Sequence, residues 1–62
     1  MEREYDLFEV LSDGAVLWRQ MAAGRDNAIR KLKELSEQTS HEIRVMHILT
    51  NTLIASMEAP KA

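Results

Sequence analysis

The dipeptide Asp13-Gly14 constrains the fold of this chain more than any other feature, because it stands between two apolar runs. The first run covers residues 4–11 and the second covers residues 15–22, and both are rich in β-branched and aromatic side chains. Asp and Gly tolerate the positive φ of a tight hairpin turn, so Asp-Gly in this setting is a strong hairpin signal. The sequence therefore predicts a strand, a turn and a second strand.

The register of this hairpin has two solutions. A two-residue loop would place Val10 opposite Leu17, whereas a three-residue loop with Gly14 in a bulge would place Val10 opposite Val16. A slip of one residue exchanges the two faces of a strand. The sequence therefore leaves open which set of side chains is buried.

Helical periodicity begins after Gly24. The apolar stripe of this segment consists of Ala28, Ile29, Leu32, Leu35 and Ser36, and charged side chains occupy the remaining surface. Residues 38–40 close the helix. A helix of about 13 residues is too short to persist alone in water, so we expect it to pack on the sheet.

The last segment returns to β-type residues. Residues 42–49 and 52–57 form two runs, and Thr50-Asn51 between them is a candidate tight turn because Asn tolerates positive φ. A hairpin with Thr50-Asn51 as its two-residue turn would place Ile48 opposite Leu53 and Met46 opposite Ala55. The predicted element order is ββαββ; one long bent strand in place of this hairpin would give ββαβ.

The length of 62 residues allows one small two-layer α+β domain, an antiparallel sheet with one helix, over residues 1–58, with a frayed tail at residues 59–62. A chain of this size is marginally stable alone, and small domains gain stability from disulfides, metals or association. The chain has no cysteine, which excludes disulfides. Self-association is therefore the leading way for it to gain stability.

Both faces of the predicted hairpin carry large apolar side chains, yet one helix can cover only one face. A solvated antiparallel face should be polar at alternate positions, and a large exposed apolar patch marks an interaction site. We therefore expect a small non-catalytic protein-interaction module that forms a two-fold homodimer. Its expected contact surface consists of Tyr5, Leu7, Leu11, Val16 and Trp18. The competing explanations are scattered exposed apolar residues, which are normal, and a misassigned register.

Nucleic-acid binding is the alternative function. Its residues would be Arg30, Lys31, Lys33 and Arg44, with Trp18 as a stacking platform. Acidic residues stand among the same helical positions, and the formal net charge is −2, so a solvated helix face explains the pattern better.

The sequence offers no catalytic or metal site, and we expect no enzyme activity and no cofactor. Asp6 and Glu9 lie three apart on a strand and point to opposite faces, so they form no local acid/base pair. His41 and His47 are too far apart along a strand to share a metal. We expect His41 to be a solvated loop residue and His47 to lie at a sheet surface. No phosphate loop or nucleophile motif is present.

The chain shows no secretory signal and no apolar run long enough to span a membrane, so the expected location is the cytoplasm. The stretch from Tyr5 to Arg19, followed by Ala28, Leu32 and Leu35 at helical spacing, resembles short uncharacterised bacterial proteins with a hairpin-helix-strand pattern. The resemblance covers most of the chain but includes no motif that carries chemistry. It implies a bacterial protein and adds no active residues.

Overall fold

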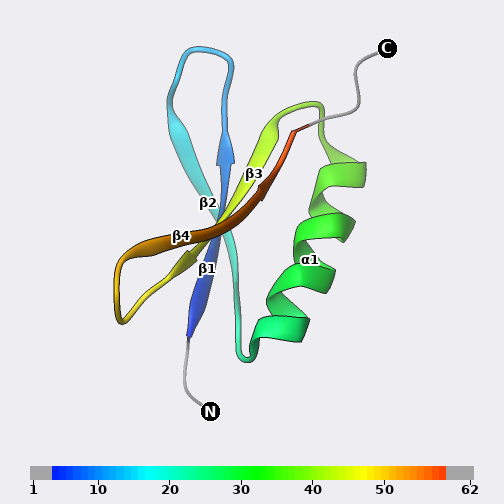
Figure 1. Ribbon diagram of the computed structural model, residues 1–62. Helices are drawn as coiled ribbons and strands as arrows, with labels where there is room; N and C mark the ends of the chain where they lie inside the picture. The colour runs from blue at the N-terminus through cyan, green and yellow to red at the C-terminus, as the bar shows by residue number, and fades with distance from the viewer. Residues whose placement is uncertain (1–3, 59–62) are drawn as a thin grey trace.

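The computed structural model describes residues 4–58 as one sheet and one helix. The elements are β1 (Tyr5–Val10), β2 (Val16–Ala22), α1 (Arg25–Gln38), β3 (Glu42–His47) and β4 (Thr52–Met57). The strands are antiparallel in the order β2-β1-β3-β4, and α1 lies on one side of the sheet (Figure 1). The predicted small α+β domain with the order ββαββ is confirmed. The predicted tail at residues 59–62 lies outside the described residues.

The first hairpin adopts the register of the three-residue loop, with Val10 opposite Val16. The Leu11 N–H donates to the Ala15 carbonyl over 2.8 Å and closes the loop. Gly14 has a φ of 89°, which a residue with a Cβ rarely adopts, and this explains why Gly follows Asp here. The pairing of Val10 with Leu17 is therefore excluded.

The two faces of β1 differ in burial. Tyr5, Leu7 and Glu9 are buried on the side of the helix, while the alternate residues point to the opposite side. A bulge in β2 at Arg19 shifts the pairing between Leu7 and the next residue of β1. Such a bulge redirects one side chain, and here it lets Arg19 reach the buried Glu9.

The second hairpin is present, but the expected register is wrong. Residues 48–51 form a four-residue turn, in which Asn51 has a φ of 52°. Met46 lies opposite Leu53, not Ala55, because the turn has four residues instead of two. Ile54 is then an extra residue on β4, so that Val45 pairs with Ala55. Ile48 belongs to the turn and has no strand partner opposite it.

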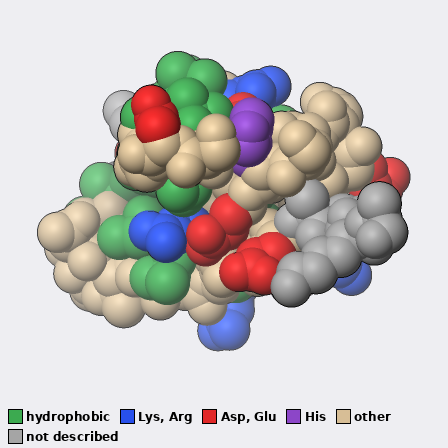
Figure 2. Space-filling model, turned by 90° about the horizontal axis from the view of Figure 1, so that it is seen from above, with side chains coloured by type: hydrophobic (Ala, Val, Ile, Leu, Met, Phe, Trp, Pro, Cys, Tyr) green, Lys and Arg blue, Asp and Glu red, His purple; other side chains and the backbone are tan. Residues whose placement is uncertain are grey.

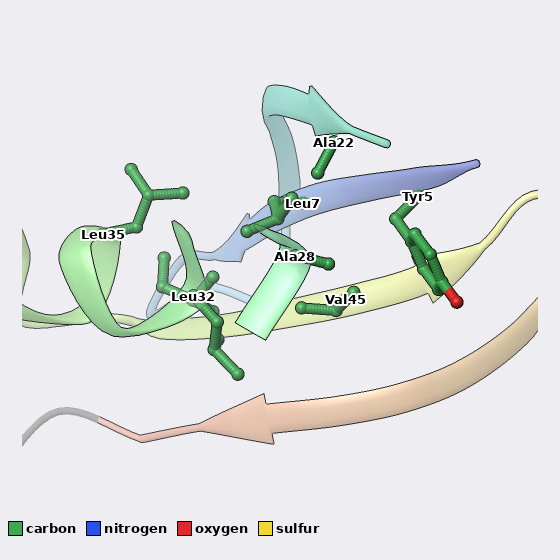
Figure 3. Packing of buried hydrophobic residues seen from close by; sticks show 8 residues of the cluster. Tyr5, Leu7, Ala22, Ala28, Leu32, Leu35 and Val45 are labelled. Carbon is green, nitrogen blue, oxygen red and sulfur yellow. The ribbon is translucent and has the colours of Figure 1, made fainter. Parts of the chain in front are cut away.

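The core lies between α1 and the sheet, and side chains from both layers meet there (Figure 3). Leu7, Ile43 and Val45 are fully buried at its centre. The predicted helical stripe is confirmed, since Ile29 packs against the core and the other four members are buried: Ala28, Leu32, Leu35 and Ser36. Burial of each large apolar side chain contributes about 1.5–3 kcal/mol.

The helix starts directly after β2, and Gly24 makes the sharp connection. Its φ of 85° and ψ of 139° lie in a region that essentially only glycine adopts. The Gly24 N–H donates to Glu4 Oε1 over 2.8 Å, which fixes the connection to the chain just before β1.

The tip of the β1–β2 hairpin and the β3–β4 turn both extend beyond the helix (Figure 1). The molecule is elongated, with extents of 37 × 21 × 15 Å. One consequence is that the start of β2 is uncovered on both sides. Three consecutive apolar residues there, Val16, Leu17 and Trp18, are 57%, 48% and 49% exposed.

Candidate interaction face

The side of the sheet opposite α1, here named the open face, carries a broad set of apolar side chains. Residues paired directly across antiparallel strands point to the same side, so the register assigns the members of this face. Trp18, Met21 and Leu53 are 49%, 54% and 49% exposed. The apolar members of the open face are Phe8, Val10, Val16, Trp18, Met21, Met46 and Leu53.

A shallow groove of about 380 Å³ is hollowed into the open face. Phe8, Val16 and Met46 supply apolar surface to its lining, and His47 and Ile48 line it near the β3–β4 turn. This shape, apolar and open to solvent, suits another side chain or a partner surface better than a small polar ligand.

Two pairs of polar side chains on the open face are bonded to each other within the chain. Arg44 Nε donates to Glu42 Oε2 over 2.8 Å, and this carboxylate raises the pKa of Arg44 above its usual range. Trp18 Nε1 donates to Asp6 Oδ1 over 3.1 Å, which holds the indole along the sheet. A partner that covered this face would therefore bury paired groups, which avoids the large penalty for an unmatched charge.

The view onto the hairpin tip shows hydrophobic side chains reaching the surface beside acidic and basic ones (Figure 2). Mixed charges around exposed apolar groups are typical of the rim of a protein–protein contact. This end of the molecule is therefore an extension of the apolar surface, not a purely polar cap.

The structure divides the five predicted contact residues between two sides of the sheet. Val16 and Trp18 lie on the open face, as expected. Tyr5 and Leu7 do not: they are 9% and 0% exposed beneath the helix. The reason is that α1 packs on the side of β1 that carries its odd-numbered residues. Leu11 is half-buried at the base of the loop.

Five members of the open face were missed by the sequence interpretation: Phe8, Val10, Met21, Met46 and Leu53. The sequence contained a signal for Phe8: it lies on the same side of β1 as Val10, and the three-residue loop pairs these two residues with Trp18 and Val16. Met21 could not be assigned, because the bulge at Arg19 exchanges the faces of β2 beyond it without a sequence mark.

The four basic residues of the nucleic-acid alternative are not brought together. Arg44 lies on the open face, on the other side of the sheet from the helix. On α1, Arg30 donates to Asn27 Oδ1 over 3.0 Å, and Lys31 donates to a side chain of β2 over 3.3 Å. Lys33 lines a separate hollow between the helix and β4. These positions form no continuous cationic surface of the kind that tracks a phosphate backbone.

Glu9 is the centre of a polar cluster that the sequence did not reveal. Glu9 is 4% exposed, and its carboxylate accepts hydrogen bonds from Thr39 Oγ1 at 2.7 Å and from Arg19 at 2.6 Å. His41 Nδ1 also contacts it. His41 lies in the loop before β3, as expected, but its side chain is 35% exposed and bonded to Glu9, so it is only partly solvated. The Thr39 hydroxyl, then His41 and Arg19, lower the pKa of Glu9 to about 2, against the opposing effect of burial.

The Glu9 cluster joins β1, the bulge of β2 and the connection from α1 to β3. Its partners lie 10, 30 and 32 residues away in the sequence, so no local motif announces it. Within residues 4–58, no group of three or more His, Cys, Asp or Glu side chains could hold a metal ion. The cluster therefore links the loop end of the β1–β2 hairpin to the chain segment that follows α1.

Comparison with known proteins finds no family model, no curated protein and no solved structure that matches this chain. The resemblance to short bacterial proteins therefore stays a prediction. Between residues 4 and 58, no helix has the length and apolar character needed to cross a membrane.

Proposed function

We propose that this protein is a small non-catalytic interaction module that forms a two-fold homodimer through its open face. The observation that carries this proposal is the half-exposed apolar surface opposite α1, from Trp18 on one edge strand to Leu53 on the other. Monomeric proteins rarely expose a contiguous apolar patch of this kind. The proposal retains the expected cytoplasmic location.

The area of the contact supports a face rather than a loop as the interface. A standard interface buries about 800 Å² per partner, which is about one fifth of the total surface of 4432 Å². Only a broad side of a molecule this small can supply that share. Covering the face would also increase the stability of the domain, because its single core buries little apolar surface.

The charges of the open face support a second copy as the occupant. Arg44 is already paired with Glu42, so the face presents no one-signed field that would select a strongly charged partner. Two copies can therefore meet on this face without burying unpaired charges of the same sign. Binding of a nucleic acid would instead require basic side chains that are available to pair with phosphates.

The test is sedimentation velocity from low micromolar to millimolar concentration, with the fluorescence of Trp18, the single tryptophan, as a second readout. We expect dimers to form as concentration rises and the Trp18 emission to shift to shorter wavelength as the face is covered. The variant Leu53→Glu should weaken the dimer at least tenfold. Leu49→Glu, at an 82% exposed turn position outside the open face, is the matched control and should not.

Two results would contradict the proposal. One is a strict monomer at millimolar concentration with unchanged Trp18 emission. The other is a gel shift with nucleic acid at low salt that fades steeply as salt rises, which would support the alternative function.

A further inference from the structure

Leu17 is an apolar residue whose exposure the open-face contact does not explain. It is 48% exposed and lies opposite Glu9, on the helix side of the sheet. A partner on the open face would cover its neighbours Val16 and Trp18 but leave Leu17 in water. A second contact would account for this side chain together with the uncovered edge of the strand that carries it.

The strand that carries Leu17 is an edge strand, since β2 has only β1 beside it in the sheet. Backbone groups in an antiparallel pair alternate between those directed at the neighbour and those directed away. The Leu11 N–H bonds to the Ala15 carbonyl, so the backbone groups of Ala15 are directed at β1. By alternation, the N–H and C=O of Leu17 are also directed at β1. The N–H and C=O groups of Val16 and Trp18 are therefore directed outward, away from the sheet. The outer edge is regular over these three residues, because the bulge begins at Arg19.

We propose that this edge pairs with the β2 of a second copy, antiparallel and about a two-fold axis at Leu17. In this register Val16 lies opposite Trp18 of the partner copy, and their outward groups exchange backbone hydrogen bonds on both sides of the axis. The two Leu17 side chains meet on the helix side and cover each other. The result is a continuous eight-stranded sheet with both helices on one side.

A second copy fits this edge because the edge is complementary to itself. The register brings Arg19 opposite Ala15 of the partner copy, so no like charges meet across the new pair. Trp18 does not obstruct the approach, since its indole is held along the sheet by Asp6. The apolar run also lacks the charges and prolines with which proteins usually protect an exposed edge.

Amide hydrogen exchange tests the edge contact directly. In a monomer, the outward N–H groups of Val16 and Trp18 should exchange fast while Leu17 is protected. At concentrations where the protein associates, Val16 and Trp18 should become protected at least tenfold. Fast exchange at both residues in the associated protein would overturn the proposal.

Two variants separate this contact from the open-face contact, and neither depends on the other. Leu17→Lys places two like charges at the axis and should weaken the edge contact at least tenfold, whereas Leu49→Lys should not. Val16→Pro and Val16→Thr both change a side chain of the open face, but only Val16→Pro removes one outward N–H per copy. Val16→Pro should therefore associate about thirtyfold more weakly than Val16→Thr. Association that resists Leu17→Lys and Val16→Pro but is lost in Leu53→Glu would overturn the edge proposal and leave the proposed function standing.

Discussion

The substitution Leu7→Ala distinguishes the core side of β1 from the open face. Leu7 is 0% exposed and lies in the core beneath α1 (Figure 3). Truncation of a fully buried Leu removes about 2–5 kcal/mol, because a cavity remains where the side chain was. A domain of 62 residues has a total stability of about 3–9 kcal/mol. Leu7→Ala should therefore remove at least about a fifth of the free energy of unfolding.

The assay is urea denaturation followed by circular dichroism, at a protein concentration where the chain is monomeric. Leu49→Ala is the matched control: at 82% exposure it should change the stability by less than about 0.5 kcal/mol. The opposite pattern, unchanged stability of Leu7→Ala together with weaker association, would show that Leu7 belongs to an interface. The assignment of the two faces would then be wrong.

Two further predictions concern the acid stability and the connection into the helix. The folded-state pKa of Glu9 is about 2, below the usual 4.5, so its favourable contribution is complete above pH 4.5 and is lost as the pH falls toward 2. Glu9→Gln should show a smaller loss of stability in that window, and urea midpoints that fall with acid as steeply as in the wild type would contradict this. Gly24→Ala should destabilise the fold by about 1–3 kcal/mol through backbone strain alone, since an added Cβ would meet nothing closer than Asn27 at 3.9 Å. A thermal melt checks it, and an unchanged midpoint would contradict the strained φ.

The elements of this fold could be predicted because their signals are local. Asp13-Gly14 indicated the first turn, and the helical stripe around Leu32 is the one that packs on the sheet. Asn51, with its positive φ, lies in the second turn as expected.

The faces of the sheet could not be predicted with the same information. The length of the first loop decides which side chains of β2 share a face with Phe8 and Val10, and both loop lengths suit Asp-Gly. Which face of β1 is buried depends on the side that α1 covers. The bulges at Arg19 and Ile54 then shift the two edge strands once more. The Glu9 cluster is harder still, because an acidic residue within an apolar strand is most simply interpreted as solvated until distant partners are known.

The position of β1 at the inside of the sheet has a consequence for how the chain folds. β1 pairs with its sequence neighbour β2 and also with β3, which comes only after the whole helix. Each hairpin closes through nearby residues, but neither contains the complete core, so both remain marginal until they join. The docking of β1 on β3 has the highest loop-closure entropy of any strand pairing here, and we expect this step to limit the rate at which the domain forms.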